Sequence, residues 1–177
     1  MRTYQCASRS TCFSILAYFA TGLNPLAANF FIFLACMFAL LVFGESIALL
    51  VAAIFFDIGM ATTVASVCMS VFNIMSGFFR SGATVPEIVK IVNYILPTKY
   101  AAEVMSINEF QGLTFNCPGS QALADGACQF STGTQVLETY AFDVSKLWVD
   151  FGIMFGLTIC VRFISFLVLH YRKVNIS

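Results

Sequence analysis

Charged residues are scarce in this sequence. Only 10% of its 177 residues are Asp, Glu, Lys or Arg, and nine basic residues balance nine acidic ones. Soluble domains carry about 25% charged residues. The lack of a basic surplus argues against a nucleic-acid-binding protein. Histidine is almost absent too, since His170 is the only one, and no His/Cys spacing suits a metal site.

Catalytic motifs are also missing. The sequence contains no Walker motif, no glycine-rich phosphate loop and no arrangement typical of an activated nucleophile. We therefore expect no catalytic residue in this chain, no bound cofactor, and no ATP hydrolysis by the chain alone.

Apolar residues are abundant instead. They make up 59% of the chain, and the mean hydropathy is +0.87. A soluble chain this short could not bury so much apolar surface. Residues 26–56, 58–79 and 147–169 are each long enough to cross a bilayer, which takes about 20 apolar residues in a helix. The sequence predicts an all-α integral membrane protein, a polytopic helix bundle.

A fourth apolar segment, residues 13–20, is too short to span a membrane. Arg2 and Arg9 precede it, an order also found in signal peptides. The interpretation we favour is the surviving end of a further spanning helix.

The orientation follows from basic residues beside the spans. Arg172 and Lys173 follow the last span, which predicts a cytoplasmic C-terminus. The hairpin turn at Asp57 is then cytoplasmic, and the loop of residues 81–146 lies outside.

This large loop carries helix signals of its own. Thr84 and Glu87 form a capping box around Pro86, followed by an amphipathic stretch that stops before Pro97. It is too short and too charged to span, so we expect a re-entrant or interfacial helix. Shorter helices are expected over 99–110 and 134–140.

Cys117 and Cys128 lie in the polar part of the loop. An oxidising compartment favours a disulfide between them. Two free thiols and an intermolecular bridge through Cys128 remain alternatives.

Three features inside the predicted spans are polar. Glu45 lies in the first span, where a carboxylate either has a function or makes a structural hydrogen bond. Arg162 in the last span is expected to snorkel toward the headgroups, or to pair with a carboxylate. The second span carries a stripe that marks either close helix packing or a partly wet cavity; its members are Thr62, Thr63, Ser66, Ser70, Asn73 and Gly77.

Several strings, in this order and spacing, resemble one family. They are Glu45-Ser46, the string from Ser76 to Arg80, Asn108-Glu109-Phe110-x-Gly112, and Cys117-Pro118. They resemble the C-terminal membrane half of ABCG-type transporters, the white/breast-cancer-resistance-protein branch of ABC transporters with an ABC-2 type membrane domain. Because the Glu-Ser and Ser-Gly-Phe-Phe-Arg strings are typical of plant and fungal members, the resemblance implies that those are the closer relatives.

The resemblance implies a half-transporter with six spans. Residues 1–23 would then end a truncated third helix, 24–80 form the fourth and fifth, 81–146 the external loop with its re-entrant helices, and 147–177 the sixth helix and cytoplasmic tail. It further implies a nucleotide-binding domain that holds ATP and Mg, a second half-transporter as partner, and residence in the plasma membrane.

The resemblance also implies residue roles. Thr63, Ser66, Met69, Ser70 and Asn73 match positions that line a substrate cavity, and Phe78 and Phe79 match an apolar plug above it. Cys117 matches a loop cysteine, and Cys128 a position that bridges subunits in some members. Because the loop has no third cysteine, we favour an internal Cys117–Cys128 bond.

The function implied is ATP-driven export of lipids, sterols or other amphipathic small molecules. Two other interpretations stay open. One is a membrane scaffold with a disulfide-stapled external loop, and the other is a proton-coupled carrier that uses Glu45.

The disulfide gives the first prediction. Mass mapping of unreduced peptides should find Cys117 linked to Cys128. Finding both thiols free to alkylation, or Cys128 linked to a second copy of the chain, would refute the internal bond.

Overall fold

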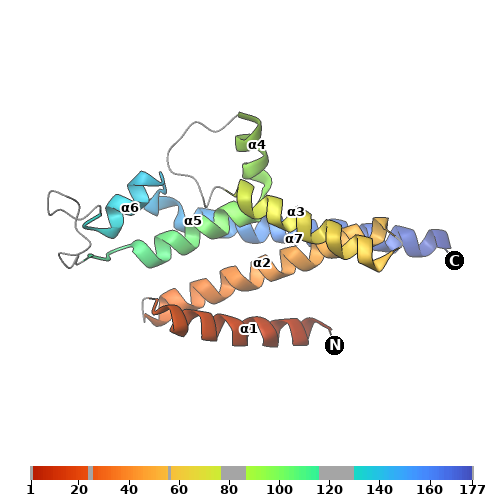
Figure 1. The fold of residues 1–177 in the computed structure, drawn as a ribbon, viewed down its shortest axis with the longest axis horizontal. Coiled ribbons are helices and arrows are strands. Elements are labelled where there is room, and N and C mark those ends of the chain that lie inside the picture. The colour runs from red at the N-terminus through yellow and green to blue at the C-terminus, as the bar shows by residue number, and fades with distance from the viewer. Residues whose placement is uncertain (1, 24–25, 56, 77–86, 116–129, 177) are drawn as a thin grey trace.

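A computed structural model describes residues 2–23, 26–55, 57–76, 87–115 and 130–176 (Figure 1). These residues form seven α-helices and one short 3-10 helix, and a single isolated β-bridge joins Thr114 to Thr132. Three helices are long and apolar enough to cross a membrane. The predicted all-α membrane fold is therefore confirmed.

The three long helices begin close to the predicted positions. They are α2 (Ala27–Ile54), α3 (Ile58–Met75) and α7 (Leu147–Ile176). A tight turn joins α2 to α3, and Asp57 caps α3 by accepting hydrogen bonds from the backbone N–H groups of Gly59 and Met60. Phe78 and Phe79, at the end of the predicted second span, lie outside the described residues, as do Cys117 and Cys128.

Helix α1 (Arg2–Thr21) is longer than the apolar segment that predicted it. It lies beside the first half of α2 (Figure 1). The buried ring of Tyr18 packs against Phe30 and Phe33 of α2, with centroids 5.1 and 5.4 Å away. Aromatic pairs at these separations add to the stabilisation from buried area.

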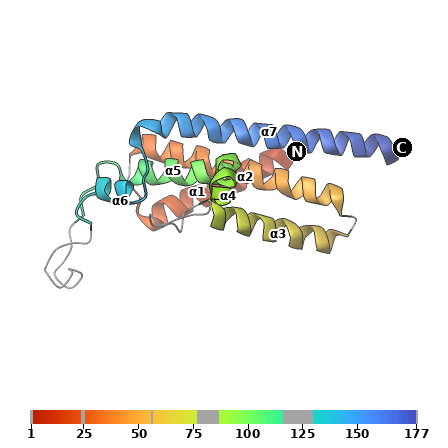
Figure 2. The same cartoon turned by 90° about the horizontal axis from the view of Figure 1, so that it is seen from above.

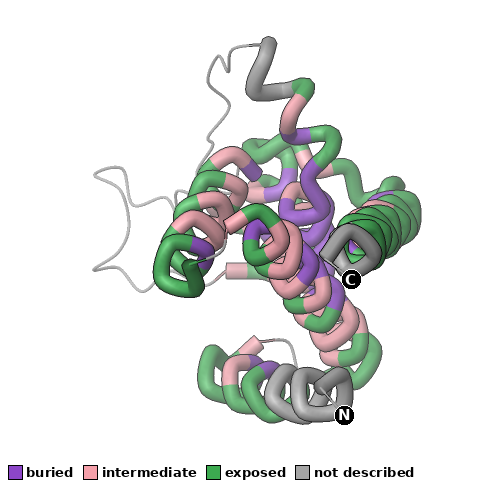
Figure 3. Tube along the Cα trace, turned by 90° about the vertical axis from the view of Figure 1, so that its right-hand side faces the viewer, coloured by how far each residue is buried: buried purple, intermediate pink, exposed green. Residues whose placement is uncertain are grey.

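Helix α5 (Pro97–Phe110) lies along both α2 and α7 (Figures 1 and 2). It begins two residues before the predicted start, because Pro97 occupies the first turn, where its missing N–H costs nothing. The three helices share one buried cluster, made of Cys36, Ala39, Tyr100, Ala101, Val104 and Met154. Small residues at such contacts let helix backbones approach closely. Figure 3 shows the buried positions gathered where these helices meet.

A reciprocal pair of hydrogen bonds fixes one end of this contact. The side-chain amide of Asn29 donates to the backbone carbonyl of Asn108 at 3.0 Å, and the amide of Asn108 donates to the carbonyl of Asn29 at 3.0 Å. Asn108 lies in the last turn of α5, where carbonyls lack helical partners, and Asn29 lies in the first turn of α2, where its carbonyl accepts the Asn108 amide in addition to its helical bond. The pair therefore satisfies a terminal carbonyl of α5 and links it to the start of α2.

Helix α4 (Glu87–Ile95) crosses the long axis of the molecule and is seen nearly end-on in Figure 2. Ile91, Tyr94 and Ile95 are exposed on it. The carbonyl of Tyr94 accepts a hydrogen bond from the Tyr100 hydroxyl at 3.0 Å. That bond ties α4 to α5.

Helix α6 (Gly133–Thr139) packs against the end of α5. Ile107, Leu137 and Leu147 form a second buried cluster there. The backbone of Gly133 comes so close to Phe110 that a Cβ would overlap its carbonyl oxygen. Only glycine fits at this position.

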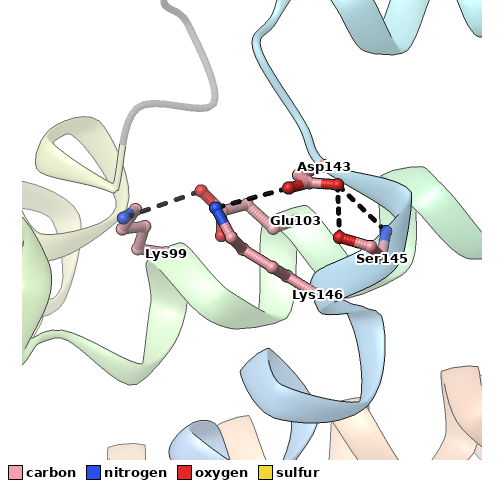
Figure 4. Close-up of polar contacts among 5 residues, drawn as sticks. All are labelled: Lys99, Glu103, Asp143, Ser145 and Lys146. Carbon is pink, nitrogen blue, oxygen red and sulfur yellow. Dashed lines mark hydrogen bonds and ion pairs between the residues drawn. The ribbon is translucent and has the colours of Figure 1, made fainter.

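Charged side chains of α5 and of the segment that leads into α7 lie near one another (Figure 4). Lys99 lies 3.7 Å from Glu103 on α5, and Lys146 lies 3.4 Å from Asp143 across the 3-10 helix η1 (Val144–Lys146). Asp150, in the first turn of α7, is buried. Burial raises the pKa of Glu103, with a further rise from the charge of Asp150, while Lys99 acts in the opposite direction.

The Asn29–Asn108 pair gives a stability prediction. Asn108→Ala removes the hydrogen bond from the Asn108 amide to the Asn29 carbonyl, so the free energy of unfolding should fall by about 1 kcal/mol. The thermal midpoint of the detergent-solubilised protein measures this loss. Gln111→Ala, at an exposed position just past α5, should change it by less than about 0.5 kcal/mol. Equal effects of the two substitutions would contradict the role of the pair.

Glu103 gives a pH prediction. Because its pKa is raised in the folded state, its contribution to stability is fully present below the ordinary value of 4.5 and is lost as the pH rises through the raised value. Glu103→Gln should remove this loss, so its thermal midpoint at neutral pH should match or exceed that of the wild type.

The difference between Glu103→Gln and the wild type should vanish as the pH falls to 4.5. Glu138→Gln, on the exposed side of α6, is the control and should leave the profile unchanged. If Glu103→Gln lowers the midpoint at neutral pH, the Lys99 ion pair outweighs the burial of the carboxylate.

Candidate functional site: the polar face of α3 and the adjoining cleft

Helix α3 is the least covered of the three long helices. Only 11% of the most apolar stretch of α3 is buried, against 28% of the corresponding stretch of α2. Ala61 is the one buried residue among the described residues of the helix. Its exposed surface divides into two neighbouring faces. We call one the polar face, made of Thr62, Thr63, Ser66, Ser70 and Asn73. The other is apolar, made of Met60, Val67, Val71 and Ile74.

The polar face follows from helical spacing. Positions three, four and seven residues apart fall on one side of an α-helix. Each side chain on this face donates to a backbone carbonyl one turn earlier. The distances are 3.0 Å for Thr63 and 2.9 Å for each of Ser66, Ser70 and Asn73. These bonds use one donor of each side chain, and the oxygen atoms keep lone pairs that can accept from water or a ligand.

The residues predicted to line a cavity do not all lie on the same face of α3. Thr63, Ser66, Ser70 and Asn73 are exposed on the polar face. Met69 is half-buried and turned toward α2, where its Cε lies 3.4 Å from the place a Cβ would take at Gly44. The predicted plug residues, Phe78 and Phe79, lie outside the described residues, and their role stays a prediction.

The two charged residues inside the spans lie side by side. Glu45 Oε2 on α2 is 3.7 Å from Arg162 Nη1 on α7, and the two side chains are 39% and 37% exposed. Of the two expectations for Arg162, the structure shows the ion pair. The sequence analysis did not predict that these two residues pair with each other, although their positions within the spans are compatible with a contact. Glu45 and Arg162 lie eleven and seven residues before the ends of two predicted spans that cross in the same direction.

A buried hydrogen bond holds α2 and α7 together next to the ion pair. The Ser165 hydroxyl donates to the carbonyl of Ser46 at 3.0 Å, and both side chains are buried. The Ser46 hydroxyl itself donates to the Val42 carbonyl at 2.6 Å. Small hydroxyl residues at such a contact permit close packing, and both serine hydroxyls have an acceptor.

A cleft of about 640 Å³ opens between α2, α3 and α7. Glu45 and Arg162 lie at one end, and Phe55 and Ile58 lie at the α2–α3 turn. The rest of the wall is formed by Ala48, Leu49, Ala52, Ala61, Thr62, Ala65 and Ser66. Thr62 and Ser66 thus belong both to the polar face and to the cleft.

The described part of the chain offers no metal centre, since no three His, Cys, Asp or Glu side chains gather there in a way that could hold an ion. The arrangement has no nucleophile with a neighbouring base. What it presents is binding surface: an exposed row of hydroxyl and amide groups, and a mostly apolar cleft with a charged pair at one end.

The sequence of this chain resembles those of known transporters. It is 31% identical over 169 residues to ATP-binding cassette sub-family G member 5 of Mus musculus, which covers 93% of this chain and 26% of that protein. It is 26% identical over 168 residues to ABC transporter G family member 23 of Arabidopsis thaliana, with 95% of this chain and 26% of that protein covered.

A third relative is the broad substrate specificity ATP-binding cassette transporter of Sus scrofa, 27% identical over 168 residues. The match covers 93% of this chain and 25% of that protein, so the chain spans about a quarter of the length of these relatives. Animal and plant members match comparably, which gives no support to a special kinship with plant and fungal members.

A family match agrees with the individual relatives. Residues 7–110 match the ABC-2 type transporter family, a segment that includes α2, α3, α4 and α5. The polar face of α3 and the Glu45 end of the cleft lie inside it. This chain belongs to the ABC-2 type transporter family, in whose membrane domain α2 and α3 lie, and the three relatives named above are ABCG transporters.

Proposed function

We propose that this chain forms part of the membrane domain of an ATP-driven exporter of the ABCG type, and that the polar face of α3 lines its substrate cavity. The observation that carries the proposal is the exposure of Thr63, Ser66, Ser70 and Asn73 on a helix of membrane-spanning length.

Hydrocarbon is a poor environment for this face. Bonds to the preceding turn reduce the cost of a serine or threonine hydroxyl in lipid. Asn73 keeps a carbonyl oxygen and a second N–H that its bond to Met69 does not use. Polar groups inside a membrane therefore face protein or water-filled cavities rather than lipid. The apolar face beside it, with Val67, Val71 and Ile74, suits lipid or a partner helix.

The partner proposed across the cavity is a second half-transporter, which forms a homodimer or a heterodimer with this one. A nucleotide-binding domain would hold ATP and Mg, and the names of two of the relatives say that those proteins are ATP-binding. ATP binding can switch such a cavity only if the substrate makes different contacts in the two states. Hydroxyl and amide groups of α3 can provide this difference in substrate contacts if they lie close to a partner helix in one state and away from it in the other.

The cargo proposed is a lipid, a sterol or another amphipathic small molecule. The mixed character of the surface supports this, because a polar face and an apolar face lie side by side along α3. Residence in the plasma membrane, a cytoplasmic C-terminus, an external segment 81–146 and roles for Phe78 and Phe79 as a plug belong to the same proposal.

The proton-coupled carrier is disfavoured by one contact. That interpretation rests on Glu45 as a lone carboxylate, but Glu45 lies 3.7 Å from Arg162. Glu45→Gln separates the two functions. If the protein is an exporter, the Glu45→Gln variant retains ATP-dependent transport. If it is a proton-coupled carrier, transport does not require ATP and the variant loses it. The scaffold interpretation gives no reason for an exposed polar face on α3.

Asn73 tests the cavity directly. In the complete transporter, Asn73→Leu should weaken by about fivefold the apparent affinity for substrates that stimulate ATPase activity. This factor corresponds to the loss of one hydrogen bond of about 1 kcal/mol. Ile74→Leu, one residue away on the apolar face, is the matched control and should leave substrate profile and basal ATPase unchanged. If Ile74→Leu has the larger effect, the apolar face lines the cavity instead.

A further inference from the structure

We propose that the cleft between α2, α3 and α7 is a second ligand site, which binds a neutral amphiphile through one hydroxyl placed between Glu45 and Arg162. The inference does not depend on transport, and it would hold for a membrane protein with no cargo.

The first argument is the spacing of the charged pair. Glu45 Oε2 and Arg162 Nη1 are 3.7 Å apart, beyond the 2.7–3.2 Å of an N–H···O hydrogen bond. Nη1 is shielded from solvent, and no described residue accepts a hydrogen bond from it. A buried donor in this state costs free energy unless a ligand or a water molecule completes it.

The second argument is the chemistry that completes such a pair. A hydroxyl group donates one hydrogen bond and accepts others. It can therefore donate to the Glu45 carboxylate and accept from Arg162 at once. An anionic headgroup would be repelled by Glu45, and a cationic one by Arg162, because the two charges lie close together. A neutral alcohol avoids both repulsions.

The third argument is the shape of the remaining wall. From Glu45 to Phe55 is ten residues of α2, about 15 Å at 1.5 Å per residue. Small side chains leave room along this length, namely Ala48, Ala52, Ala61 and Ala65. The volume of about 640 Å³ lies within the range of roughly 300–1,000 Å³ typical of small-molecule sites. The cleft thus suits a hydrocarbon body that extends from the charged pair toward the α2–α3 turn.

The site is separate from most of the polar face. Ser70 and Asn73 do not line the cleft, and only Thr62 and Ser66 are common to both. Asn73→Leu should therefore leave binding in the cleft intact, which distinguishes failure of this inference from failure of the proposed cavity.

The experiment uses photolabelling in membranes of cells that produce the complete protein. The probe is dodecanol with a diazirine and an alkyne tag, and the control probe is its methyl ether, which cannot donate to Glu45. Mass mapping should place the dodecanol label on peptides of α2, α3 or α7, with labelling about tenfold stronger than by the ether. Equal labelling by the two probes would overturn the proposal.

Variants test the location. Ala48→Phe fills the cleft from α2 and should reduce dodecanol labelling about tenfold. Ala28→Phe makes the same change at an exposed position of α2 outside the cleft and should not alter it. Ala65→Phe fills the cleft from α3 and serves if Ala48→Phe does not fold. Wild-type labelling in a correctly folded Ala48→Phe or Ala65→Phe protein would show that the cleft holds only water or lipid chains.

Discussion

The packing of α5 between α2 and α7 determines the rest of the arrangement. Ala39 and Ala101 are almost fully buried where these helices meet, and Val104 and Met154 are buried completely. Because lipid chains are as apolar as leucine, burial gives little driving force between helices in a membrane, and close van der Waals contact must supply it. Small residues at the centre make that contact close. The reciprocal bonds between Asn29 and Asn108 then fix how α5 lies along α2.

The arrangement around α5 leaves α3 with a single large contact. Helix α3 follows α2 through the Asp57 turn and packs on it near Gly44 and Met69. Its other side stays uncovered (Figures 2 and 3). The sequence places hydroxyl and amide groups on that uncovered side. In a membrane this combination requires an aqueous or protein partner. The proposed cavity follows from this consequence, whereas the proposed ligand cleft rests on the Glu45–Arg162 pair and the small residues beside it.

The sequence predicted the parts of the fold that depend on local composition. The long spans were evident from hydropathy alone, and Asp57 was evident as the break between two of them. Contacts between distant segments were not predictable in the same way. Asn29 and Asn108 are separated by 79 residues, and no local pattern links them. The same holds for Glu45 and Arg162, which could be matched only by comparing their depths in two spans. Met69 shows a further limit, since the family resemblance placed it with the cavity residues while packing turned it toward α2.

The account depends most on which side of α3 meets water. Single cysteines introduced at residues 60–74, in a protein whose other cysteines are replaced by alanine, can be tested with a membrane-impermeant thiol reagent. The account predicts fast modification at Thr62, Thr63, Ser66, Ser70 and Asn73, and slow modification at Met60, Val67, Val71 and Ile74. Fast modification confined to the second set, or no helical periodicity at all, would contradict it.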